Sequence, residues 1–110
     1  YCETQNKEPF LVAPKDSGMM GWREALDYAS RNNAKLPTSE QLSAMYEARN
    51  KGGLKETFNL TGHFHDSSYW CSKLCSTEYA WYKNFSEGND GNESVYRRLS
   101  LRCVRTCSNN

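Results

Sequence analysis

The stretch "YWCSKLCSTEYAWYKNF", residues 69–85, combines two aromatic-rich runs with two cysteines four positions apart. "SSYWCSK" (67–73), which overlaps its start, and "AWYKNF" (80–85) are rich in Tyr, Trp and Phe, which favour β-strands, so each run predicts a strand. The two cysteines could bind a metal, carry out redox chemistry or staple a small extracellular fold. The role of these cysteines therefore decides whether the protein is an enzyme, a zinc module or a binding domain.

The sequence before this stretch predicts a helix in "MGWREALDYASRNN", residues 20–33. Its apolar residues fall at i, i+3, i+4 and i+7, a spacing that puts them on one face of a helix. The members of this stripe are Trp22, Ala25, Leu26 and Ala29.

A second helix is predicted in "LPTSEQLSAMYEARNKGG", residues 36–53. Thr38 can cap the first free backbone amides, and Gln41 stands three residues later, as a capping box requires. Gly52-Gly53 is expected to end the helix. The predicted buried face consists of Leu42, Met45 and Tyr46.

The C-terminal part predicts a further strand in "VYRRLSLRCVR", residues 95–105, where apolar and polar side chains alternate. The preceding "SEGNDGNES", residues 86–94, predicts a turn-forming loop with Asp90-Gly91 near its middle. Helices followed by a small antiparallel sheet give an α+β fold.

Size and charge narrow the class of protein. The 110 residues, 1–110, suit a single domain, and 14 basic against 13 acidic side chains argue against a dedicated nucleic-acid binder. No apolar run approaches the roughly 20 residues that span a membrane, so membrane insertion is not expected. Without an initial methionine, the chain is expected to be an excised or mature segment. Five cysteines in so short a chain favour an oxidising, extracellular compartment.

Five motifs together resemble the Lcl C-terminal-like domain family, named for the C-terminal domain of the Legionella collagen-like adhesin. They are "GWREALDYAS" (21–30), "KLPTSEQLSAMYEA" (35–48), "YWCS" (69–72), "STEYAWYKNFSEG" (76–88) and "LRCVR" (101–105). The resemblance covers about residues 20–105. It implies a C-type-lectin-like fold and an extracellular bacterial domain at the cell surface, where the collagen-like members are trimeric adhesins that bind sulfated glycosaminoglycans.

The cysteines are expected to form disulfides. In a lectin-like fold the chain ends lie side by side, so the resemblance implies that Cys2 could bridge to Cys107, and Cys103 could pair with Cys71 or Cys75. One cysteine of the five must then stay unpaired within the chain. Family members usually carry serine at the position of Cys71, and "KLC" (73–75) is an insertion relative to them.

Metal binding is the alternative role for these thiols. His63 and His65 join Cys71 and Cys75 as four possible zinc ligands within thirteen residues, although the spacing differs from common zinc sites. Redox catalysis fits less well, because the reactive pattern is Cys-x-x-Cys at a helix start. We favour disulfides and expect no cofactor.

The acidic loop offers oxygen ligands that calcium prefers, foremost Glu87, Asn89 and Asp90. Sugar-binding lectins of this fold often hold calcium with such residues, although the loop lacks the Glu-Pro-Asn segment that accompanies it. Asn, Asp and Gly are also ordinary turn residues, and a solvated turn is the favoured interpretation.

A basic strip is the candidate ligand-binding surface. Arg98 and Arg102 would lie on one strand face about 13 Å apart, with Lys83 on the preceding strand beside them and Arg97 adjacent. Guanidinium groups suit sulfate and carboxylate, although the same arginines could instead form ion pairs. Tyr82, with Tyr1 and Tyr79, is a surface candidate for stacking on sugars, whereas Trp70 and Trp81 are expected in the core.

No motif resembles a catalytic set, so the expected function is a non-enzymatic adhesin domain that binds glycans, foremost sulfated polysaccharides of a host or the environment. The alternatives are a protein-recognition or structural tip domain, as in pili or phages, and a metal-dependent lectin.

Overall fold

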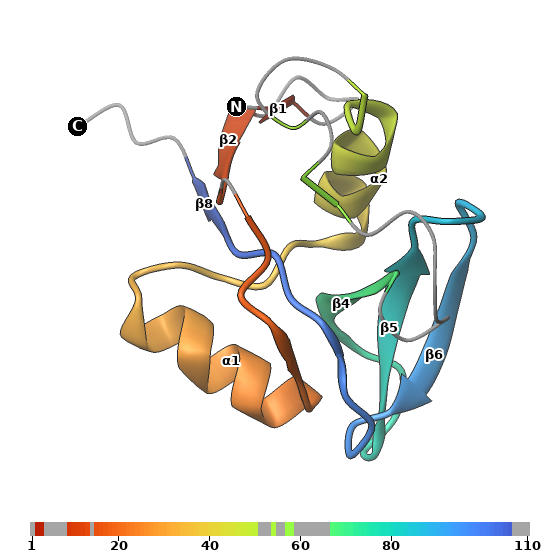
Figure 1. Cartoon of the computed structure of the whole chain (residues 1–110). Helices are drawn as coiled ribbons and strands as arrows, with labels where there is room; N and C mark the ends of the chain where they lie inside the picture. Colours follow the sequence, from red (N-terminus) through yellow and green to blue (C-terminus); the bar gives the residue numbers. More distant parts are fainter. Residues whose placement is uncertain are drawn as a thin grey trace.

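The computed structural model describes residues 2–3, 9–13, 15–50, 54, 57–58 and 67–106 of the chain. Within them the chain forms two helices and two sheets, which confirms the α+β class (Figure 1). The helices are α1 (Trp22–Arg31) and α2 (Ser39–Glu47). The strands are β1 (Cys2–Glu3), β2 (Pro9–Val12), β3 (Met19–Met20), β4 (Ser68–Leu74), β5 (Tyr79–Asn84), β6 (Asp90–Ser94), β7 (Leu99–Ser100) and β8 (Val104–Thr106).

The smaller sheet has the order β1-β2-β8, so the first and last described strands flank the same partner. The larger sheet has the order β3-β7-β4-β5-β6. Its pairings are antiparallel except that of β4 with β7, where Tyr69 lies opposite Ser100 in parallel register. The expectation of antiparallel sheets therefore holds for all pairs but this central one.

Strand β4 separates two apolar cores because its successive side chains point to opposite faces. Tyr69 and Cys71 belong to the cluster that includes Leu42 and Met45 of α2. Trp70 belongs to the other cluster, together with three residues of α1, Trp22, Ala25 and Ala29. The two helices therefore each cover one core, and β4 lies between them (Figure 1).

Local signals in the sequence set both helices. The capping box of α2 is present as predicted: Gln41 N donates to Thr38 Oγ1 at 3.1 Å, and Thr38 N donates to Gln41 Oε1 at 2.9 Å. The helix ends at Glu47, before the predicted stop at Gly52-Gly53, which lies outside the described residues. On α1 the predicted stripe is buried except for Leu26, which is 37% exposed.

Strand β6 corrects a prediction, because residues 90–94 were expected in a loop. Asp90–Ser94 pairs with β5 over five residues, and the actual turn lies just before it. Gly91 lies opposite Tyr82, whose ring occupies the space that a Cβ at position 91 would need. In the turn, Gly88 has φ +82° and lies against the ring of Tyr46 on α2.

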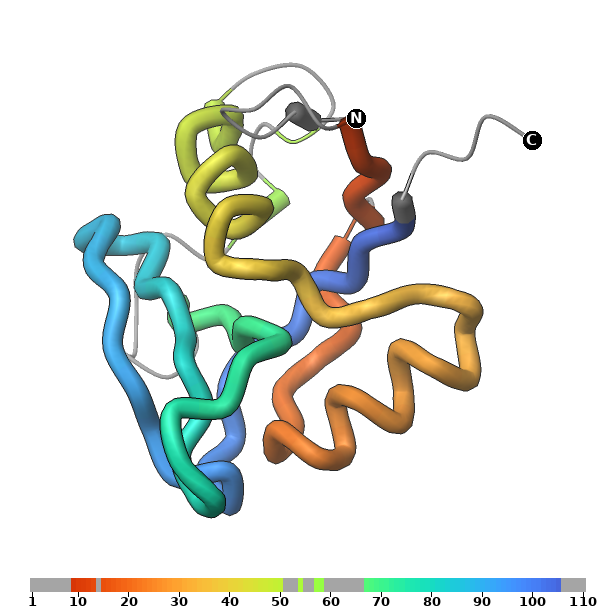
Figure 2. The backbone as a smooth tube through the Cα atoms, turned by 180° about the vertical axis from the view of Figure 1, so that it is seen from behind, coloured from red at the N-terminus to blue at the C-terminus, as the bar shows by residue number. Residues whose placement is uncertain are grey.

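The segment between the helices crosses the last strand, as Figure 2 shows from behind. Lys35 and Val104 exchange two backbone hydrogen bonds of 2.9 Å, which fixes this crossing. The start of α2 is thereby held beside both sheets. Neither described helix has the length and apolar character that a membrane span requires.

Candidate functional site

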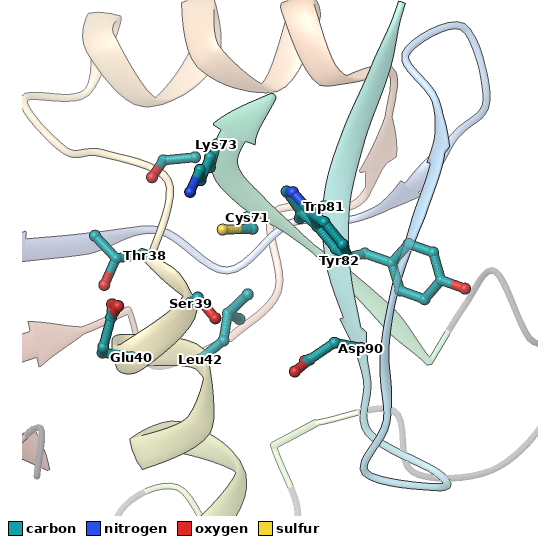
Figure 3. A pocket seen from close by; sticks show the side chains of 10 residues that line it. Thr38, Ser39, Glu40, Leu42, Cys71, Lys73, Trp81, Tyr82 and Asp90 are labelled. Atoms are coloured by element: carbon teal, nitrogen blue, oxygen red, sulfur yellow. The ribbon is translucent and has the colours of Figure 1, made fainter. Parts of the chain in front are cut away.

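A groove between the first turn of α2 and strands β4 and β5 is the candidate site (Figure 3). We call it the main groove. Its cavity has a volume of about 510 Å³, within the range of small-molecule sites. It is lined by Thr38, Ser39, Glu40 and Leu42 from α2 and its cap, by Cys71, Ser72 and Lys73 from β4, by Trp81 and Tyr82 from β5, and by Asp90 from β6.

A β-bulge shapes the β4 wall of the main groove. Trp70 pairs with Tyr82 and Leu74 pairs with Ala80, so three residues of β4 stand opposite Trp81 alone. In a regular strand, successive side chains alternate between faces, and only every second one could line a groove. The bulge breaks this alternation, as bulges do when they redirect side chains near sites. For this reason Cys71, Ser72 and Lys73 all line the groove.

Both helical regions hold the bulge in place. Trp22 on α1 donates its indole N–H to the carbonyl of Cys71 at 2.8 Å, a buried contact. Ser72 donates its backbone N–H to the carbonyl of Pro37, just before α2, also at 2.8 Å. Two backbone groups that leave the regular ladder at the bulge, the Cys71 carbonyl and the Ser72 N–H, are thereby satisfied within the protein. The wall of the groove is fixed by the fold itself.

The lining of the main groove combines an aromatic ring with short polar groups. Trp81 is half-buried and packs against the core cluster of α2, and its ring borders the groove. Thr38 and Ser39 bring hydroxyls, Glu40 a carboxylate and Lys73 an ammonium group. This composition provides an apolar face together with donors and acceptors around it.

Charges in the main groove nearly balance. Asp90 places Oδ1 3.4 Å from the buried ammonium of Lys83, and its side chain is 51% exposed. With Asp90 paired in this way, Glu40 and Lys73 bring one negative and one positive charge to the lining of the cavity (Figure 3). The groove therefore has no strong preference for an anionic or a cationic ligand.

The thiol of Cys71 points into the main groove in Figure 3 but is a poor nucleophile. Burial raises the pKa of the Cys71 thiol, and this outweighs the opposite effect of the backbone N–H groups of Lys73 and Ser72. A thiol with a raised pKa stays protonated at neutral pH, and the thiolate is the reactive form. Cys71 is 2% exposed and contributes shape to the groove floor.

The predicted basic strip is wrong, because Arg102 is not at the surface. Its side chain is fully buried, and its Nε and Nη2 donate to Asp16 Oδ1 at 2.9 and 2.7 Å. The other donors reach Ala13 O at 3.0 Å, Thr57 Oγ1 at 3.1 Å and the carbonyl of Thr57. The guanidinium also lies 4.2 Å from the centroid of the Phe58 ring. The prediction failed because residues 99–104 are buried on both sides, so no face of this segment meets solvent.

The other predicted ligand-binding residues do not form a shared exposed surface either. Lys83 is 7% exposed and donates to the carbonyl of Gly88 at 3.2 Å, so it cannot serve the surface. Tyr82 lines the main groove, but its ring points toward β6 (Figure 3). Arg97 and Arg98 are exposed, but they lie in the turn between β6 and β7.

The predicted pairing of Cys103 with Cys71 or Cys75 is wrong, because all three are free thiols. Cys71 and Cys103 belong to different core clusters, and the sulfur of Cys103 lies 4.0 Å from Ser17 Oγ. Cys75 is exposed at the turn after β4. The implied bridge between Cys2 and Cys107 involves side chains outside the described residues.

Some of the predicted metal ligands lie outside the described residues, and the others do not form a metal site. His63 and His65 lie outside the described residues, as does Tyr1. Among the residues that are described, no group of three or more His, Cys, Asp or Glu side chains could hold a metal ion. Of the calcium candidates, Asp90 is paired with Lys83, and Glu87 and Asn89 are exposed in the turn before β6.

Sequence reasoning missed the main groove. Trp81 was expected in the core, and it does pack there, but it also borders the cavity; Trp70 is fully buried as predicted. The capping residue Thr38 was recognised only for its role in the helix. Comparison with models of known protein families and with curated protein sequences gives no match for this chain.

Proposed function

We propose that this domain binds glycans and that the main groove, rather than the predicted basic strip, is the binding site. Trp81 carries the proposal, because the flat apolar face of a sugar ring packs well on an aromatic ring that borders a groove. The hydroxyls of Thr38 and Ser39 and the carboxylate of Glu40 lie where sugar hydroxyls need partners. An apolar wall with a few convergent polar groups is the usual composition of a small-ligand site.

The near balance of charge in the main groove favours neutral sugars over sulfated polymers. A polyanion is best bound by a row of cations, and here Lys73 is matched by Glu40. Arg102 and Lys83, which were expected to supply that row, are buried. The class of ligand is therefore revised from anionic to neutral glycans.

We further propose that the fold is C-type-lectin-like and that the domain is a non-enzymatic module at a bacterial cell surface, presented as a trimer in a collagen-like adhesin. The resemblance of residues 20–105 to the Lcl C-terminal-like family motivates this. The flanking of β2 by both β1 and β8 supports the fold assignment, because lectin-like domains bring their chain ends together. Sedimentation velocity would test the trimer, and a chain monomeric at all concentrations would argue against it.

A glycan array followed by titration calorimetry tests the site. We expect neutral glycans to bind and Trp81→Ala to weaken binding about tenfold, as loss of about 1–1.5 kcal/mol of stacking implies. Tyr79→Ala is the matched control, because Tyr79 lies on the same strand, is 46% exposed and does not line the groove. An array without hits, or equal loss in both variants, would refute the proposal.

A sulfated glycan bound at the turn between β6 and β7 is the second candidate function. The observation in its favour is that Arg97 and Arg98 are adjacent and exposed. Heparin affinity chromatography across a salt series separates it from the first candidate. Retention that falls with salt and is lost in Arg97→Ala/Arg98→Ala would favour this surface, since exposed charge contacts are screened by salt.

A further inference from the structure

A second hollow adjoins the main groove between α1 and α2. Its cavity has a volume of about 450 Å³. Apolar side chains dominate its lining, foremost Leu26, Ala29, Leu36 and Val104, with Lys35 and Gln41 among the polar residues. We call it the interhelix hollow.

The two cavities share Thr38 and Ser72 in their linings. These two residues are joined through the hydrogen bond from Ser72 N to Pro37 O, so they form one fixed boundary between the cavities. Thr38 Oγ1 accepts the N–H of Gln41, which leaves the hydroxyl proton of Thr38 to be donated to a ligand. A ligand that crosses this boundary would meet hydroxyl groups midway.

Leu26 has an exposure that its place in the sequence does not predict. It belongs to the apolar stripe of α1, yet it is 37% exposed while Trp22, Ala25 and Ala29 of the same stripe are buried. Its side chain lines the interhelix hollow. The hollow therefore offers a second apolar surface, on the far side of the Thr38–Ser72 boundary from Trp81.

From this arrangement we propose that the site takes a linear neutral oligosaccharide, with one sugar ring on Trp81, hydroxyls at Thr38 and Ser72, and a further ring in the interhelix hollow. The inference rests on the proposed glycan-binding function and deepens it. Alternating apolar ring faces and hydroxyls along a sugar chain match the order of surfaces along the two cavities.

An extended peptide fits the same path less well. A peptide strand needs backbone partners, which an exposed sheet edge supplies. Along this path two backbone groups of the bulge already bond within the protein: Ser72 N to Pro37 O, and Cys71 O with the indole of Trp22. The side chains that line the path offer hydroxyls, the amide of Gln41, a few charged groups (Glu40, Lys73 and Lys35) and apolar surface, which suit the hydroxyls and ring faces of a sugar chain.

The test is a chain-length series. Neutral malto-oligosaccharides and fully N-acetylated chito-oligosaccharides of one to six rings are titrated into the protein by calorimetry. In at least one series we expect affinity to rise about tenfold between one ring and three or four, then level off once both cavities are filled; tenfold corresponds to about 1.4 kcal/mol.

Two variants locate the gain. Leu26→Gln should abolish the rise with chain length, whereas Trp81→Ala should weaken binding at every length. Leu74→Gln is the matched control, because Leu74 is a similarly exposed leucine, at 39%, outside both cavities.

Three outcomes would overturn the inference. Binding that depends on Trp81 but not on chain length would remove the interhelix hollow and leave the proposed function standing. A rise with length that persists in Leu26→Gln would place the further ring elsewhere. No binding in any series would overturn the inference, and an empty glycan array would then refute the proposed function as well.

Discussion

Replacing Arg102 by Met should destabilise the domain more than any other single substitution of an arginine among the described residues. Methionine keeps much of the side-chain volume but removes the charge and all donors. The five N–H groups of Arg102 make five hydrogen bonds, two to Asp16, two to Thr57 and one to Ala13. The substitution leaves the carboxylate of Asp16, whose side chain is 20% exposed, without this partner.

The magnitude follows from the burial of the pair. Removing one member of a buried ion pair costs about 3–5 kcal/mol, because the remaining charge stays desolvated. The partial exposure of Asp16 places the expected loss near the lower end, at about 3 kcal/mol. Since each kcal/mol shifts the Tm of a domain of this size by about 4–8 °C, the melting temperature should fall by about 12–24 °C.

Urea unfolding followed by tryptophan fluorescence measures this loss, because Trp22 and Trp70 are buried in the core. Arg98→Met is the matched control: Arg98 is exposed, and its replacement should change the free energy of unfolding by less than about 0.5 kcal/mol. The double variant Asp16→Asn/Arg102→Met should recover part of the loss by removing a carboxylate charge that has lost its ion-pair partner. Equal midpoints for Arg102→Met and the unsubstituted protein would refute the reasoning.

Three further predictions concern the turn, the cap and the thiols. Gly88→Ala should lower stability by about 1–3 kcal/mol in thermal unfolding, since φ is +82° and a Cβ would come within 2.6 Å of the Tyr46 hydroxyl oxygen. Thr38→Ala should cost about 1 kcal/mol by the same measurement, and Thr38→Ser should retain most of the cap; equal losses in both would contradict the capping role. Iodoacetamide at neutral pH should label exposed Cys75 and spare Cys71, as mass spectrometry of the peptides would show. Because burial raises the pKa of the Cys71 thiol, its thiolate forms only at higher pH, so its labelling should increase as pH rises, and fast labelling at pH 7 would contradict its burial.

The helices could be predicted because their determinants are local. The capping box of Thr38 and Gln41 is written in four consecutive residues, and the structure contains it as expected. The strands of the aromatic stretch were also recognised, since their composition favours strands wherever they pair. These elements needed no knowledge of distant partners.

Elements that depend on distant partners were missed. Strand β6 consists of turn-forming residues, but it forms a strand because it pairs with β5 through an antiparallel ladder. The ring of Tyr82 also covers Gly91. The short strand β3 exists through its pairing with β7, about eighty residues away in the chain. Strand composition alone cannot indicate such pairings.

The candidate site was predicted poorly because it depends on two features of the tertiary structure: the burial around Arg102 and the register of β4 against β5. The alternation around Arg102 was interpreted as a half-exposed strand, although residues on both sides of it are buried in the core. The main groove depends on a shift in register between β4 and β5, for which the sequence of neither strand gives a distinct pattern. The residues were visible in the sequence, but their grouping was not.

The anchoring of the β4 bulge has a kinetic consequence. Fixing the backbone of one residue costs about 1–2 kcal/mol of conformational entropy. At Cys71 and Ser72 the backbone is already fixed in the folded protein by hydrogen bonds with Trp22 and Pro37, so ligand binding does not have to order it. The β4 wall of the main groove is therefore expected to be rigid before a ligand binds. Association should then follow a single phase without a slow rearrangement, and ligands of the wrong shape should be rejected rather than accommodated.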